Sequence, residues 1–159
     1  MVERLGPALA TRKMHFFFLL DVSGSMAEHG KIGALNEAMR AALPAIQEAE
    51  DSNPGVEVLV RAVAFSENAW WHIVEPTPVD QLVWVDLVPI TQGVTETGLA
   101  IELVTKELRA FGEKKRALPP AIVLVSDGQP TTYKEPHYDV ALAALLAEFW
   151  GGKAARMAI

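Results

Sequence analysis

The sequence predicts a three-layer, doubly wound α/β fold of the Rossmann-like kind, in which helices cover both faces of a mainly parallel sheet. Three apolar runs have the composition of strands that are buried on both faces: Phe16–Leu20, Val56–Phe65 and Ala121–Val125. Between these runs, apolar residues recur every three or four positions, which is the spacing of amphipathic helices. This alternation of strands and helices favours mainly parallel order.

The helical spacing predicts helices at Lys31–Glu50, at about Glu96–Phe111 and at Asp139–Trp150. Pro44 lies inside the first of them and removes one backbone donor, so we expect a kink or a break there. The pair Gly151–Gly152 is expected to close the last helix.

An antiparallel hairpin is predicted in the middle of the chain. A turn at Ser66–Asn68 joins Val56–Phe65 to a strand that begins at Ala69. Pro76 and Pro78 are expected to end this strand, which places it at an edge of the sheet. The last predicted elements are a loop with one helical turn at Val79–Val94 and a strand that starts at Ala155.

Composition limits the class of protein. The chain has 159 residues, and we assign 1–159 to a single domain with a flexible segment at 1–13. It has no apolar run of about 18 residues, so no membrane span is expected. It has no cysteine, which is typical of a cytoplasmic protein. The net charge is −6, and the basic cluster Lys114–Arg116 is interpreted as a solvated turn, so no nucleic-acid partner is expected.

Oxygen-bearing side chains directly follow two of the apolar runs. Asp21, Ser23 and Ser25 come after the first run, and Asp127 comes after the third. In open α/β sheets, ligands bind beyond the carboxyl ends of the strands, so we expect these side chains to meet at one edge. Carboxylates and hydroxyls without a nearby His or Cys suit Mg²⁺, Ca²⁺ or Mn²⁺ rather than zinc or copper.

Three segments resemble, in this order, the metal-ion-dependent adhesion site (MIDAS) of the von Willebrand factor A (vWA) domain. They are "DVSGSM" at 21–26, "GVTETGLAI" at 93–101 and "VSDGQPTT" at 125–132. The resemblance implies five metal ligands: Asp21, Ser23, Ser25, Thr95 and Asp127. Val94 departs from the pattern, because the family often has a second glycine there. The chain is most similar to the bacterial tellurium-resistance, TerY-like branch, whose members are often encoded beside a kinase and a PP2C-type phosphatase.

This resemblance implies strand order 3-2-1-4-5, with the antiparallel strand at one edge and the elements that normally follow the fifth strand missing. We therefore expect the 159-residue form to self-associate, or to be less stable than a longer form. The implied function is not enzymatic. A bound Mg²⁺, Ca²⁺ or Mn²⁺ receives an Asp or Glu of a protein partner, such as a kinase or PP2C-type phosphatase from the same operon. The alternative is a Mg²⁺-dependent phosphohydrolase that uses the strand-end aspartates.

Several residues have a second interpretation. Asp21 and Asp127 are also typical cap or turn residues. Glu96 either supports the site or is a first-turn acid favoured by the helix dipole. Trp70 and Trp71 point to opposite faces of their strand, one to the core and the other to the surface or a partner. Without an ion, two nearby carboxylates repel, so we expect Asp127→Ala to be mild or stabilising for the metal-free fold. The histidines are interpreted as surface or strand residues rather than ligands: His15, His29, His72 and His137.

Overall fold

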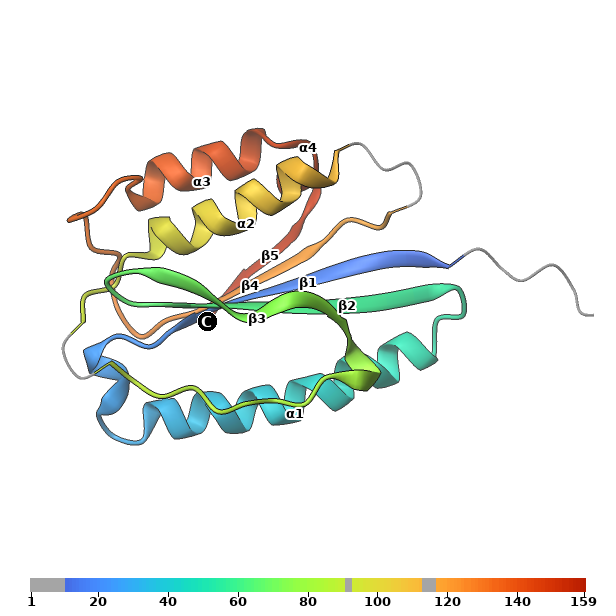
Figure 1. Ribbon diagram of the computed structural model, residues 1–159, viewed down its shortest axis with the longest axis horizontal. Coiled ribbons are helices and arrows are strands. Elements are labelled where there is room, and N and C mark those ends of the chain that lie inside the picture. Colours follow the sequence, from blue (N-terminus) through green and yellow to red (C-terminus); the bar gives the residue numbers. More distant parts are fainter. Residues whose placement is uncertain (1–10, 91–92, 113–116) are drawn as a thin grey trace, which may run out of the picture.

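The structure is a computed structural model that describes residues 11–90, 93–112 and 117–159. These residues form a five-stranded sheet between two layers of helices (Figure 1). The strands are β1 (Arg12–Asp21), β2 (Val56–Phe65), β3 (Ala69–Pro78), β4 (Ala121–Val125) and β5 (Ala155–Ala158). One face is covered by α1 (Lys31–Asp51), and the other by α2 (Thr97–Phe111), α3 (Tyr138–Ala147) and α4 (Phe149–Lys153).

The strand order is β3-β2-β1-β4-β5, with β1 in the centre. β1 pairs in parallel with β2 along its whole length and with β4 from Phe16 to Leu20. β4 and β5 are also parallel, whereas β2 and β3 form an antiparallel hairpin that puts β3 at an edge. The predicted fold class and strand order are therefore confirmed.

The apolar run of β1 is buried because each face of the sheet has its own helical layer. Phe17 and Leu19 belong to the core on the α2 and α3 side, and Phe18 and Leu20 belong to the core on the α1 side. None of the four is more than 5% exposed. Since consecutive strand residues point to opposite faces, a central strand between two cores requires an unbroken apolar run.

Prolines interrupt the elements less than predicted. α1 continues through Pro44 without a break, and because Pro44 is exposed, water can reach the helix carbonyl that loses its partner there. β3 continues through Pro76 and ends at Pro78, so the predicted end of the strand is right for Pro78 and wrong for Pro76. An edge strand tolerates proline, because one of its sides needs no backbone donors. The predicted helical turn after this strand is confirmed as η2 (Val79–Gln81), a 3₁₀ turn.

The predicted helix at Asp139–Trp150 is two helices, α3 and α4. Glu148 between them has extended backbone angles (φ −73°, ψ 145°). The pair Gly151–Gly152 lies inside α4, so the prediction that it closes the helix was wrong. A Cβ on Gly151 would lie 1.9 Å from the carbonyl oxygen of Leu145. Glycine is therefore needed here for close packing against α3 rather than for ending a helix.

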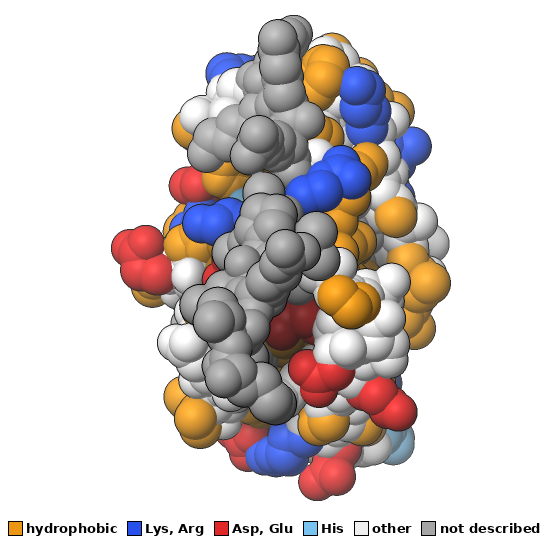
Figure 2. Space-filling model, turned by 90° about the vertical axis from the view of Figure 1, so that its right-hand side faces the viewer, with side chains coloured by type: hydrophobic (Ala, Val, Ile, Leu, Met, Phe, Trp, Pro, Cys, Tyr) orange, Lys and Arg blue, Asp and Glu red, His pale blue; other side chains and the backbone are white. Residues whose placement is uncertain are grey.

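Two predicted features fall wholly or partly outside the described residues. β1 begins at Arg12, so the last two residues of the segment 1–13 belong to the strand, and residues 1–10 are not described. Lys114–Arg116 also lies outside the described ranges. Within those ranges, no helix is long and apolar enough to cross a membrane. Figure 2 shows the end of the molecule where β1 and β2 begin, and acidic, basic and hydrophobic side chains are interspersed there.

Candidate metal site

The predicted ligands lie at the edge of the sheet where β1 and β4 end side by side. Leu20 pairs with Val125 in the parallel ladder, so the residues after these two positions leave the sheet together. Asp21 is the last residue of β1 and is fully buried. Asp127 follows the end of β4, and its side chain is 19% exposed.

Asp21 holds two of the loops at this edge. Its Oδ1 accepts a hydrogen bond from the backbone N–H of Ser23 (2.8 Å), and its Oδ2 accepts one from the hydroxyl of Ser126 (2.6 Å). Both carboxylate oxygens are thus engaged inside the protein. Sequence reasoning assigned no role to Ser126, although a hydroxyl directly before Asp127 could have suggested one.

Ser23 and Ser25 bring their hydroxyls together next to Asp127. The two Oγ atoms lie 3.3 Å apart, and Ser25 donates a hydrogen bond to Oδ1 of Asp127 (2.8 Å). Ser25 is presented by η1 (Gly24–Ala27), a 3₁₀ turn that the sequence analysis did not predict. The hydroxyls of the first loop and the carboxylate of the third loop are therefore in direct contact.

Thr95, in the second loop, is 7% exposed and lies against the other two loops. Gly24 N–H donates to the carbonyl of Gly93 (3.3 Å), which ties the second loop to the first. Thr131 N–H donates to the carbonyl of Thr95 (2.8 Å), and a Cβ on Gly128 would lie 3.9 Å from Thr95 Oγ1. The structure thus brings all three predicted loops together.

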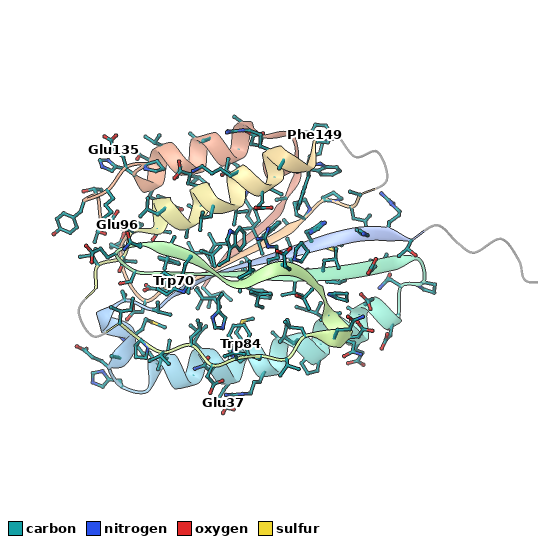
Figure 3. The ribbon with its side chains drawn as sticks, viewed as in Figure 1. Glu37, Trp70, Trp84, Glu96, Glu135 and Phe149 are labelled. Atoms are coloured by element: carbon teal, nitrogen blue, oxygen red, sulfur yellow. The ribbon has the colours of Figure 1, made fainter. Side chains whose placement is uncertain are left out.

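Glu96 supports this arrangement from inside the protein. It is 1% exposed, and Figure 3 shows it at the end of the sheet, beside the start of α2. Its Oε1 accepts hydrogen bonds from the hydroxyl of Thr131 (2.8 Å) and from the backbone N–H of Tyr133 (3.0 Å). Of the two interpretations of Glu96, these contacts favour the supporting role, because they hold the third loop against the second.

Lys31, the first residue of α1, adds a positive charge to the site. Its Nζ lies 2.6 Å from Oδ2 of Asp127. The hydrogen bond from Lys31 is the main cause that lowers the pKa of Asp127 below its usual value of 3.8. The same bond raises the pKa of Lys31 above its usual 10.5. Sequence reasoning missed this contact, and its assumption of uncompensated repulsion at Asp127 is corrected accordingly.

The donors suit a hard divalent cation. Two ligands at right angles around Mg²⁺, each at about 2.1 Å, are about 3.0 Å apart. The separation of 3.3 Å between the hydroxyl oxygens of Ser23 and Ser25 is close to this value. No group of three or more His, Cys, Asp or Glu side chains is placed to hold a metal in the described ranges. An ion at this edge therefore depends on hydroxyl oxygens as well as on Asp127.

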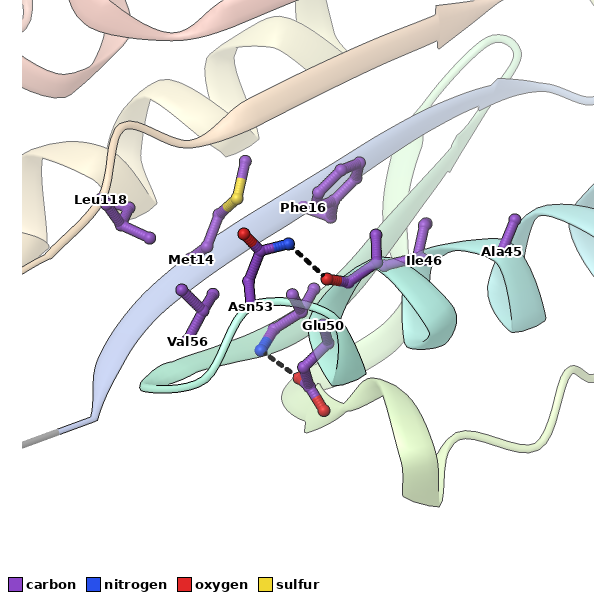
Figure 4. Close-up of a pocket in the computed structure, with 10 residues that line it drawn as sticks. Met14, Phe16, Ala45, Ile46, Glu50, Asn53, Val56 and Leu118 are labelled. Carbon is purple, nitrogen blue, oxygen red and sulfur yellow. Dashed lines mark hydrogen bonds between the residues drawn. The ribbon is translucent and has the colours of Figure 1, made fainter. Parts of the chain in front are cut away.

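Another hollow lies at the opposite end of β1 (Figure 4). It has a volume of 480 Å³ and lies between β1 and the end of α1, where Met14, Phe16 and Ile46 contribute apolar surface. Met14 precedes Asp21 by seven strand residues, or about 23 Å along β1. This hollow is therefore separate from the candidate metal site.

Trp70, Trp71, His15 and His72 lie in strands, in line with their predicted roles. Trp71 packs against the core on the α2 side, whereas Trp70 is 38% exposed, so the prediction of one core and one surface tryptophan is confirmed. The ring of His15 in β1 contacts the ring of Phe111, and the ring of His72 in β3 contacts the carbonyl of Val85.

No protein-family model matches the sequence, and no curated protein matches it significantly. Solved structures do match. The ArnB paralog VWA2 from Sulfolobus acidocaldarius has a TM-score of 0.57 and 21% identity, and the match covers 94% of this chain and 35% of that chain. Proximal thread matrix protein 1 from the mussel byssus, with a zinc-occupied MIDAS motif, has a TM-score of 0.62 and 13% identity over 94% and 38% of the two chains. The pilus adhesin SpaC from Lactobacillus rhamnosus GG has a TM-score of 0.60 and 22% identity over 76% and 16%.

These matches establish the fold of the protein, which is that of the vWA domain. At 13–22% identity they establish the fold alone. The chain spans between about a sixth and two fifths of the length of the three proteins, at 16–38%. Their activities and partners therefore belong to much longer polypeptides.

Proposed function

We propose that this protein is a metal-dependent, protein-binding module of the vWA type, with Asp21, Ser23, Ser25, Thr95 and Asp127 holding one divalent cation. The observation that carries this proposal is the contact between Ser25 and Asp127, which are 102 residues apart in sequence and belong to different loops. The zinc-occupied MIDAS motif of the mussel thread protein, which has the same fold, supports it.

The proposed ligands divide into two kinds. Ser23, Ser25 and Thr95 offer neutral hydroxyl oxygens, and Asp127 offers a carboxylate. Asp21 contributes directly or through water, and it also orients the first loop through its bond with Ser23 N–H. An ion held largely by neutral oxygens keeps positive character, and as a Lewis acid it accepts one more oxygen ligand. An Asp or Glu side chain of a partner protein has the charge and geometry to supply that ligand.

We propose that the protein is not an enzyme. An aspartate-nucleophile phosphohydrolase needs an accessible carboxylate oxygen at the strand end. Asp21 is fully buried, so a substrate phosphoryl group cannot approach its oxygens for attack. Ser23 also stands where such an enzyme would have its second carboxylate. These observations favour a binding module over the hydrolase alternative.

The finer proposal concerns the ion and the biological setting. We propose Mg²⁺, with Ca²⁺ and Mn²⁺ as the other candidates, because the donors are hard oxygens. The sequence resemblance to TerY-like proteins supports a cytoplasmic adaptor in a stress or defence system. Its partner there would be a kinase or a PP2C-type phosphatase from the same operon that presents an acidic residue.

Calorimetric titration of Mg²⁺ and Mn²⁺ into wild type and Asp127→Ala tests the proposal. We expect wild type to bind one ion and Asp127→Ala to lose most of the affinity, because the carboxylate ligand is gone. Asp80→Ala, which removes an exposed aspartate from η2, is the matched control and should bind like wild type. A pull-down of the proposed kinase or PP2C-type phosphatase partner, with and without EDTA, tests the binding role.

Two results would contradict the proposal. The first is equal metal affinity in wild type and Asp127→Ala, or a partner that stays bound in EDTA. The second is Mg²⁺-dependent phosphatase or nucleotide turnover that disappears in Asp21→Ala, which would make the protein an enzyme.

A further inference from the structure

Lys31 places a positive charge inside the cluster of proposed metal ligands. Its Nζ lies 2.6 Å from Oδ2 of Asp127, and its side chain is 37% exposed. The other oxygen of Asp127, Oδ1, accepts the hydroxyl hydrogen of Ser25 (2.8 Å). Both oxygens of the carboxylate thus have partners within the protein itself.

The position of Lys31 is set by the backbone that follows the first metal loop. η1 carries Ser25, and Lys31 N–H donates to the carbonyl of Glu28 (3.1 Å). Gly30 then takes a left-handed conformation (φ 71°) as the N-cap of α1. This conformation favours glycine, so the turn that delivers Lys31 to Asp127 is encoded locally. The hydroxyl of Ser25 and the ammonium of Lys31 therefore reach the same carboxylate from one short segment.

The charges at the site make the ammonium a competitor of a metal ion. Asp21 and Asp127 provide two formal negative charges, and Lys31 compensates one of them. A divalent cation that approaches Asp127 is attracted by the carboxylate and repelled by the ammonium. Because the ion carries two positive charges, the ammonium of Lys31 repels it about twice as strongly as it would repel a monovalent cation at the same distance. The hydrogen bond from Lys31 to Asp127 must therefore weaken when the ion binds to Asp127.

We propose that Lys31 is an internal competitor that sets the concentration of divalent cation at which this site fills. In the metal-free protein it occupies Asp127 and links the start of α1 to the third loop. This inference rests on the proposed function, because it takes the ion to bind at Ser23, Ser25 and Asp127. The same ligands without Lys31 would therefore bind the metal ion more tightly than the wild-type protein does.

Titration calorimetry of Mn²⁺ at low salt measures this competition. We expect Lys31→Met to bind Mn²⁺ about fivefold more tightly or better, judged from the coupling of partly exposed ion pairs and the double charge of the ion. Lys31→Arg keeps the positive charge and should stay within about twofold of wild type. Lys106→Met removes a lysine of α2 that pairs with Glu102 (3.6 Å), and it should also leave the affinity unchanged.

Thermal unfolding provides a second readout. In EDTA, Lys31→Met should unfold at a lower temperature than wild type, because Asp127 loses its counter-charge. Saturating Mn²⁺ should raise its unfolding temperature by more than that of wild type, since tighter binding to the folded state stabilises it more. Far-UV circular dichroism verifies folding, and Lys31→Gln replaces Lys31→Met if the latter does not fold.

The outcomes separate the two proposals. If wild type binds Mn²⁺ and Lys31→Met binds it equally or more weakly, the competitor role of Lys31 is wrong while the metal site stands. If no folded variant binds Mn²⁺, the metal site itself is wrong, and the inference about Lys31 is lost with it.

Discussion

Asp127 has partners on both carboxylate oxygens, which makes the metal-free stability of the protein depend on pH. The bond from Lys31 is the first cause of its lowered pKa, and the bond from Ser25 acts in the same direction. A carboxylate with a lowered pKa stabilises the fold above its usual value of 3.8, and this contribution is lost as the pH falls through the lowered value. The pKa of Lys31 is raised above its usual value of 10.5. Its stabilisation of the fold is therefore complete below pH 10.5 and is lost as the pH rises through the raised pKa.

The directions of these two pKa shifts predict how the stability of Asp127→Asn differs from that of wild type in EDTA. We expect wild type to be the more stable protein, with a nearly constant difference between about pH 5 and pH 9, and a shrinking difference in acid. Urea unfolding at a series of pH values provides the measurement. A difference that grows as the pH falls below 3.8 would contradict the role assigned to the ion pair.

At the scale of residues, the sequence predicted which oxygen donors meet but not the groups around them. Asp21, Ser23 and Asp127 could be predicted to meet, because the ends of parallel strands share one edge of a sheet. The contact of Lys31 with Asp127 spans 96 residues and depends on the left-handed turn at Gly30, and no local pattern specifies such a contact. The 3₁₀ turn that carries Ser25 is formed by local backbone hydrogen bonds, such as Met26 N–H to the carbonyl of Ser23, and its four residues are too few to show a helical spacing.

At the scale of elements, α2 must approach the loop after β4 closely for the site to form. Gly98 lies in the first turn of α2, and a Cβ there would be 2.1 Å from the carbonyl oxygen of Pro136. We expect Gly98→Ala to destabilise the protein by about 1–3 kcal/mol, because backbone must move to admit the methyl group. Its metal affinity should fall as well, since the same loop carries Asp127.

Gly33 is the matched control for this prediction. It lies in α1, is exposed, and would have nothing within 4 Å of an added Cβ. Gly33→Ala should therefore stabilise the protein by about 0.5–1 kcal/mol, the usual gain from replacing glycine inside a helix. Chemical denaturation of both variants is the measurement. Equal effects of the two substitutions would show that the packing of α2 does not limit this region.

Helices and strands could be predicted where neighbouring residues show an apolar run or a helical spacing. The bounds of β2 and β4 follow from their apolar runs, and α1 follows from its helical spacing. The rules for proline failed where the context permits it, as at Pro44 on an exposed helix face. The extended conformation of Glu148, which separates α3 from α4, was not visible because apolar spacing continues across it.

At the scale of the molecule, the two edges of the sheet differ. β3 carries Pro76 and Pro78, which block pairing with another strand, whereas β5 has no proline. Ala155 and Ile159 donate their N–H groups inward to Pro120 and Leu124. By alternation along the strand, the N–H groups of Arg156 and Ala158 face outward.

Near this edge, an apolar groove of 450 Å³ lies between α1 and β4, and Ile159 also lines it. Met157 and Ile159 are 61% and 71% exposed. We therefore expect the 159-residue chain to self-associate with increasing concentration. Ala158→Pro should reduce this association, because it removes an outward donor and leaves the bonds to β4 intact. Sedimentation velocity over a range of concentrations is the measurement, and a wild-type monomer throughout would contradict the expectation.

The central position of β1 also has a consequence for synthesis of the protein on the ribosome. β1 is the first strand made, yet its neighbour β4 begins at Ala121, 100 residues after Asp21. At about 5–20 residues per second, translation of that interval takes roughly 5–20 s. For this time Phe16–Leu20 has no partner strand on its β4 side, although it is a short, uncharged and strongly β-forming segment. The nascent chain therefore passes through a stage in which its innermost strand is open to pairing with other chains.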